Sequence, residues 1–102
     1  MENDLETRAQ VKKILDLVKS VAPGKSVELR VPPYGVIQCV AGGNHRRGTP
    51  PNTVEMSGQT LVRLINEPSL WSSLCDSGEV RASGLLSDLS YVFVQAAVKY
   101  RA

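Results

Sequence analysis

Histidine and cysteine are scarce in this sequence of 102 residues, which contains one His and two Cys. A single histidine excludes metal sites built from several imidazoles, and any Ser-His-Asp arrangement would depend on His45 alone. Cys39 and Cys75 lie far apart, each in an apolar run, without CxxC or CxxH spacing. We therefore expect two free, buried thiols in a reducing compartment, and neither a disulfide nor a thiol nucleophile.

Long apolar runs and a large net charge are also lacking. No segment approaches the ~18 apolar residues of a membrane-spanning helix, and 12 Lys plus Arg against 10 Asp plus Glu leave a net charge of only +2. Such nearly equal numbers of positive and negative side chains do not provide the clustered basic face of a nucleic-acid-binding protein. The first residues, from Met1 to Asp4, are acidic where a secretory signal would be basic. We expect a cytoplasmic protein with no nucleic-acid partner and no integral membrane segment.

The spacing of apolar residues divides the single domain expected over residues 1–102 into two parts. Residues 1–24 show helical spacing, which predicts a surface helix that Pro23 and Gly24 end. Residues 25–102 predict a sheet with covering helices. Alternating or continuous apolar residues predict four extended segments, at residues 27–31, 34–40, 53–56 and 79–83.

Two of these strands carry further expectations. The second strand is apolar almost throughout, which predicts that it is covered on both faces. In the fourth strand, Val80 and Ala82 are expected to point inward.

Capping residues predict three more helices. Ser57 is a natural N-cap for the first of them, and Pro68 starts another over residues 69–76 that Gly78 closes. Ser87 and Asp88 are expected to cap the last helix, although residues 91–94 would also suit a strand by propensity.

The last helix has more apolar residues than one sheet can cover. Leu89, Val92, Phe93 and Ala96 form the expected core stripe, and further apolar side chains widen it: Tyr91, Val94, Ala97 and Val98. Contiguous apolar surface of this kind usually marks an interface, and a two-fold contact lets one patch cover itself. The pattern therefore predicts a homodimer through residues Tyr91 to Tyr100.

Two other features are candidates for ligand contacts. His45, Arg46 and Arg47 lie in a Gly- and Pro-rich loop, where arginine forks suit a phosphate or carboxylate. A solvated loop without a ligand is the alternative. Trp71, the only tryptophan, has leucines at helical spacing around it. It is a core anchor or the wall of an apolar cavity, and these two roles are compatible.

Several segments resemble the short bacterial members, chiefly actinobacterial, of the sterol carrier protein-like family, which is related to the sterol carrier protein type 2 domain. The segments are Val31-Pro32-Pro33-Tyr34, Gln38-Cys39-Val40, Arg47-Gly48-Thr49-Pro50-Pro51-Asn52, Val54-Glu55, Arg81-Ala82-Ser83-Gly84 and Asp88-Leu89-Ser90. The resemblance implies an α/β (α+β) domain with a mainly antiparallel sheet of about four to five strands. It also implies helices packed on one face, an apolar tunnel between the layers, and no catalytic residues.

Together these observations favour a non-enzymatic module that binds an apolar ligand (a lipid, fatty acyl chain or sterol-like molecule) between sheet and helices. We expect no cofactor and no metal. A protein–protein interaction or homodimerisation module without a small-molecule ligand is the alternative, and an enzyme is less favoured than either. The residues expected to line the pocket are Leu61, Leu64, Trp71, Leu74, Val80, Leu89, Val92 and Phe93.

Overall fold

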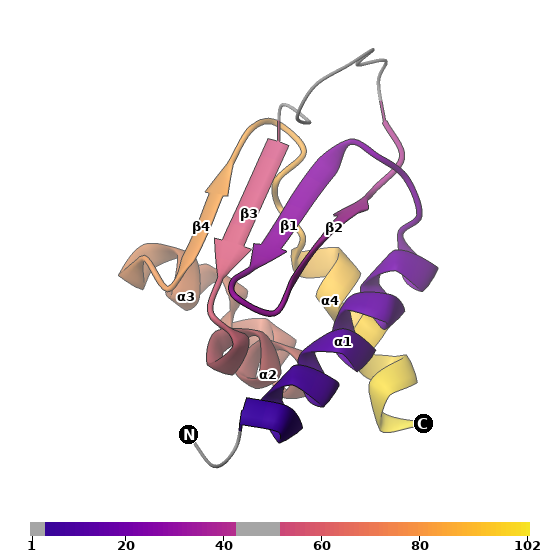
Figure 1. The fold of residues 1–102 in the computed structure, drawn as a ribbon. Helices are drawn as coiled ribbons and strands as arrows, with labels where there is room; N and C mark the ends of the chain where they lie inside the picture. Colours follow the sequence, from indigo (N-terminus) through magenta and orange to yellow (C-terminus); the bar gives the residue numbers. More distant parts are fainter. Residues whose placement is uncertain (1–3, 43–51) are drawn as a thin grey trace.

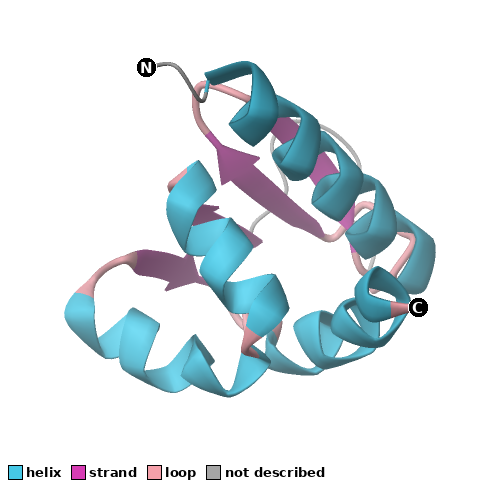
Figure 2. Ribbon diagram, turned by 90° about the horizontal axis from the view of Figure 1, so that it is seen from below, coloured by secondary structure: helices cyan, strands magenta, loops and turns pink. Residues whose placement is uncertain are grey.

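A computed structural model of the chain describes residues 4–42 and 52–102 and shows a sheet with helices on one of its faces (Figure 1). The view from below shows that the helices form one layer beneath the strands (Figure 2). This arrangement confirms the predicted mixed α/β fold. In chain order the elements are α1 (Asp4–Val21), β1 (Val27–Val31), β2 (Gly35–Cys39), β3 (Asn52–Met56), α2 (Gly58–Asn66), the 3-10 turn η1 (Pro68–Leu70), α3 (Trp71–Ser77), β4 (Val80–Ser83) and α4 (Ser90–Arg101).

The sheet has four strands in the order β2-β1-β3-β4. β1 is antiparallel to β2 and parallel to β3, and β3 is antiparallel to β4, so the sheet is mainly antiparallel as predicted. In the register of the central strands, Leu29 of β1 lies opposite Ile37 of β2 and Val54 of β3. The two central strands alternate strictly between buried and half-buried residues, because only one face of the sheet is covered.

The edge strands correct two expectations. β2 was expected to be covered on both faces, but it lies at an edge and Val36 is 58% exposed on the side that carries no helix. β4 lies at the other edge, where Val80 is buried. Ala82 pairs with the buried Val54 and so lies on the expected face, but it is exposed. In both strands the apolar residues predict more burial than the structure shows. The reason is that β propensity alone does not report the position of a strand in its sheet.

The first two helices follow the sequence pattern. α1 buries the predicted stripe and ends at Val21, two residues before Pro23. Ser57 caps α2, because its hydroxyl oxygen accepts a hydrogen bond from the backbone N–H of Thr60 at 3.1 Å. The helix expected over residues 69–76 is divided in two, because the 3-10 turn η1 occupies Pro68–Leu70 and α3 begins at Trp71. Gly78 closes α3 at a φ of 85°.

α4 is a helix, not a strand, and its beginning differs from the expected one. Leu89 occupies the N-cap position, and Asp88 accepts a hydrogen bond from the N–H of Ser90 at 2.9 Å. Ser87 does not cap the helix, because its hydroxyl donates to the carbonyl of Gly84 at 2.8 Å and closes the preceding turn. Ala97 is fully buried, so the exposed apolar arc is narrower than the sequence suggested.

A buried amide side chain joins three segments at the end of the sheet where β1 and β3 begin. The Asn52 amide nitrogen donates to the carbonyl of Ser26 at 2.8 Å, and the amide oxygen accepts from the N–H of Leu86 at 2.9 Å. Gly84 approaches so closely that a Cβ atom at this position would collide with Asn52. Asn52 therefore fixes the start of β3 against the start of β1 and against the connection between β4 and α4.

Backbone contacts close the same end of the sheet from the side of α1. Val40 donates its N–H to the carbonyl of Ala22 at 2.7 Å and accepts from the N–H of Ser26 at 3.0 Å. Its φ of 67° is unusual for a β-branched residue. Gly24 packs directly on this backbone and has no room for a side chain. The connection from α1 to β1 is thus held by main-chain geometry.

Replacing Asn52 by alanine is expected to lower the free energy of unfolding by about 2–3 kcal/mol, because the Ser26 carbonyl and the Leu86 N–H both lose their partner. Chemical denaturation measures this change. Asn66→Ala is the matched control, since the Asn66 amide makes one exposed hydrogen bond to the carbonyl of Val62. The control should change stability by less than about 0.5 kcal/mol. Equal losses in the two variants would contradict the bridging role.

Candidate ligand-binding site

The eight side chains predicted to line an apolar pocket belong to one hydrophobic core. They come from α2, α3, β4, α4 and the residue before α4, and none is more than 8% exposed. At the centre, the rings of Trp71 and Phe93 stack with their centroids 6.1 Å apart at an angle of 29°. The structure thus brings the eight residues together as packed side chains, with Trp71 the most exposed of them.

The helical wall over this core is uneven. α4 contacts α1, α2 and η1, whereas the main contacts of α3 are with β4 and η1. η1 buries no residue, and α3 has seven residues of which Trp71 and Leu74 are buried. Neither of these two elements has a side-chain hydrogen bond at its N-cap. The part of the wall that carries Trp71 is therefore held mainly by two side chains.

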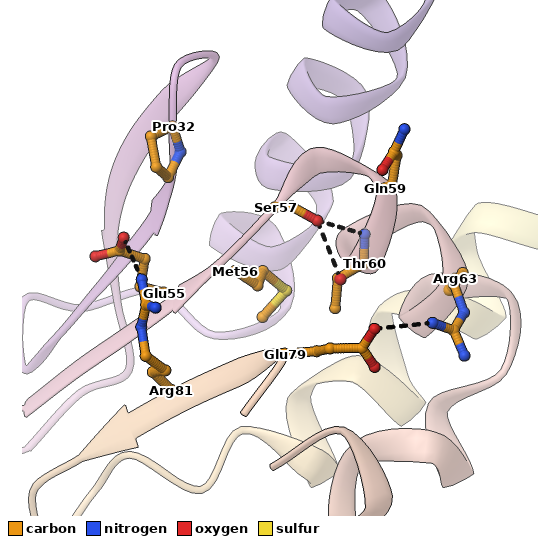
Figure 3. Close-up of a pocket in the computed structure, with 9 residues that line it drawn as sticks. All are labelled: Pro32, Glu55, Met56, Ser57, Gln59, Thr60, Arg63, Glu79 and Arg81. Carbon is orange, nitrogen blue, oxygen red and sulfur yellow. Dashed lines mark hydrogen bonds and ion pairs between the residues drawn. The ribbon is translucent and has the colours of Figure 1, made fainter. Parts of the chain in front are cut away.

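A polar groove of about 460 Å³ lies beside this core, between the ends of β1 and β3 and the beginning of α2 (Figure 3). Two ion pairs cross it, Arg63 with Glu79 at 3.6 Å and Arg81 with Glu55 at 2.8 Å. These pairs neutralise one another's charge, which leaves the groove without an excess of either sign. The lining residues are Pro32, Glu55, Met56, Ser57, Gln59, Thr60, Arg63, Glu79 and Arg81.

Charged residues also form a ladder across the open face of the sheet. Arg30 binds Glu28 at 2.6 Å and lies 3.9 Å from Glu55, which in turn binds Arg81. β1, β3 and β4 each contribute a member of this ladder. The sequence shows that charged residues alternate with apolar ones in β1. The pairing of charges across strands depends on the register, which the sequence does not reveal.

A second groove, of about 480 Å³, runs along the edge strand β4. Val80 borders on it and is the only residue of the predicted apolar set to line either of these two grooves. Cys75 of α3 also lines it and is half-buried, which corrects the expectation that both thiols are buried. β4 is an edge strand, so among the described residues no further strand lies beside it to cover that side of α3.

The two cysteines are free and have raised pKa values. Burial raises the pKa of the Cys39 thiol to about 11. Burial, followed by the charges of Asp88 and Asp76, raises the pKa of the Cys75 thiol above its ordinary value. Both thiols are therefore mainly protonated near neutral pH.

Three further predictions concern an anion contact, metal sites and membrane-spanning helices. The candidate anion contact of His45, Arg46 and Arg47 lies outside residues 4–42 and 52–102. Within those residues, no group of three or more His, Cys, Asp or Glu side chains is arranged to hold a metal ion. None of the described helices is long and apolar enough to cross a bilayer.

The fold and its covered apolar core define a class, the domains with a sterol carrier protein type 2-like fold. A solved structure titled "UbiJ-SCP2 Ubiquinone synthesis protein" is similar to this chain with a TM-score of 0.55 and 16% sequence identity, over 93% of this chain and 88% of the other. This likeness shows the fold alone. The family model of the bacterial SCP ortholog matches residues 4–94, and the chain belongs to that family. Among curated proteins, none matches the sequence closely enough to count as a relative.

Alkylation at pH 8 tests the two thiols. With a pKa of about 11, only about one Cys39 thiol in a thousand is ionised at this pH, so we expect no labelling of Cys39 in the folded protein. Cys75 is expected to react, but more slowly than in the unfolded chain. Intact mass spectrometry counts the labels, and the single variants Cys39→Ser and Cys75→Ser assign them. Labelling of Cys39 at the rate of the unfolded chain would contradict its burial.

Proposed function

We propose that this protein binds an apolar ligand (a lipid, a fatty acyl chain or a sterol-like molecule) between the sheet and the helices, and that it catalyses no reaction. The observation that carries this proposal is the arrangement of the core. Leu61, Leu64, Trp71, Leu74, Val80, Leu89, Val92 and Phe93 form a continuous apolar layer between one face of the sheet and a wall of short helices. Membership of the bacterial SCP ortholog family supports the same function.

Entry of the ligand requires movement of the wall, because the side chains of this layer are already packed together. An empty cavity long enough for an acyl chain would cost several kcal/mol in a chain of this size, so a closed state without ligand is the favourable one. We propose that η1 and α3 move outward, since Trp71 and Leu74 are the buried residues that hold them. The ligand then replaces the contacts that Trp71 makes with Phe93.

The absence of catalysis is proposed from the chemistry of the grooves. In the groove beside α2 the arginines and carboxylates are paired with one another, and no nucleophile–base pair is among its hydrogen bonds. Cys75, beside the β4 groove, has a raised pKa and is not activated. A binding module agrees better with these side chains than an enzyme does.

A homodimer through Tyr91 to Tyr100 is the alternative. The exposure of Tyr91, Val94 and Val98 favours it, and the burial of Ala97 makes the available surface smaller than expected. The actinobacterial origin, the cytoplasmic location and the anion contact at residues 45–47 stay predictions as well.

A long-chain fatty acid is expected to change the fluorescence of the single tryptophan, because the ligand would lie against Trp71. At a ligand concentration of about 100 times Kd, the free energy of unfolding should rise by about 2.7 kcal/mol. Native mass spectrometry of the same sample should show a one-to-one adduct. The absence of an adduct, of a spectral change and of stabilisation up to the solubility limit of the fatty acid would contradict the proposal.

A relocated tryptophan provides the matched control. The double variant Trp71→Phe and Val36→Trp carries its only tryptophan on the open face of the sheet, where Val36 is 58% exposed. This variant should form the same adduct in the mass spectrometer without a change in emission. A change in emission as large as that of the unmodified protein would place the ligand outside the proposed layer.

A further inference from the structure

Exposed apolar side chains are concentrated in one stretch of the described chain. Of the large apolar residues with substantial exposure, five lie between residues 85 and 98: Leu85, Leu86, Tyr91, Val94 and Val98. The last three lie on α4 at spacings of three and four residues, so they form one stripe along the outer side of this helix. Their exposed fractions are 51%, 54% and 60%. The opposite side of α4 is fully buried against the core, so this stripe has no partner within the described part of the chain.

The charged residues of α4 itself are all positive. α4 contains Lys99 and Arg101 in its last turn and no acidic residue. Lys13 of α1 adds a third positive charge, because its ammonium group lies 5.1 Å from the centre of the Tyr100 ring. Asp88, which precedes the helix and binds the N–H of Ser90, is the only acid after residue 79. Exposed apolar side chains and nearby cations are the two kinds of contact by which a helix binds an anionic lipid surface.

We propose that the outer side of α4 docks on an anionic lipid surface. Tyr91, Val94 and Val98 would enter the boundary between headgroups and acyl chains, while Lys13, Lys99 and Arg101 would contact the acidic headgroups. A dimer agrees less well with these observations. Burial of Ala97 leaves only three side chains on the stripe, which is a narrow patch for a stable interface between subunits.

The proposal is independent of whether the core accepts a ligand, and its test uses protein without added fatty acid. Sedimentation with vesicles of equal parts phosphatidylglycerol and phosphatidylcholine measures the partition coefficient. We expect binding to these vesicles, at least about tenfold weaker binding to vesicles of phosphatidylcholine alone, and a further loss as salt is raised.

Two sets of variants test the two parts of the surface. Val94→Glu together with Val98→Glu removes apolar contact, and Lys99→Glu together with Arg101→Glu reverses the charge. Each pair is expected to reduce the partition coefficient at least about tenfold. Val36→Glu is the matched control, because Val36 is 58% exposed, as Val98 is 60% exposed, but lies on β2. It should bind the acidic vesicles as the unmodified protein does. Circular dichroism and thermal unfolding establish that each variant is folded.

Three results would overturn the proposal. The first is no sedimentation with acidic vesicles at millimolar lipid. The second is a loss of binding that is the same for Val36→Glu as for the α4 variants. The third is a dimer, seen by analytical ultracentrifugation without lipid, that Val94→Glu with Val98→Glu converts into a folded monomer. In that case the stripe is the contact between two copies of the chain.

Discussion

The parallel pairing of β1 with β3 depends on the buried amide of Asn52. Parallel neighbours cannot be joined by a tight turn, so their register needs another constraint. Here the Asn52 side chain bonds to the carbonyl before β1 and to an N–H in the connection before α4. One side chain therefore joins the start of β3 to the start of β1 and to the chain that leads into the last helix. The glycine at position 84 is required because the backbone passes directly over this amide.

The positions of the helices follow from that sheet. With one face covered, β1 and β3 present every second residue to the helices and place their charged residues on the other side. The buried row in turn determines which sides of α1, α2 and α4 must be apolar. α3 differs, because it lies at the edge strand and shares less surface with the rest of the core. The same geometry that makes the core continuous thus leaves one of its walls with few contacts.

Periodicity and capping residues predicted most of the elements. Ser57, Pro68 and Gly78 act locally, through their own backbone or hydroxyl group, and each lies at a helix boundary as expected. Apart from Ser87, which closes a turn instead of capping α4, the errors concern non-local facts. Val36 and Ala82 are exposed because their strands are at the edges, and Ala97 is buried because α4 packs against α1 as well as α2.

In the candidate site, too, local features were predicted from the sequence and non-local ones were not. The sequence identified the apolar residues that gather in one core, since apolar side chains at helical and strand spacing must be buried somewhere. It did not indicate the polar groove, because Glu55 and Arg81 are 26 residues apart and meet only through the pairing of β3 with β4. Nor did it distinguish Asn52 from the other polar residues of its loop, since a buried amide depends on contacts from distant segments.

The one-sided cover of the sheet has a mechanical consequence. The sheet is tied together by Asn52 at one end and by a charge ladder over its open face, whereas in the layer beneath it the seven-residue α3 has its main contacts with β4 and η1 only. Any increase in the volume of the interior must then be accommodated on the helical side. The protein would then expand toward its helical side only. Amide hydrogen exchange would report this asymmetry as fast exchange in α3 and slow exchange in β1 and β3.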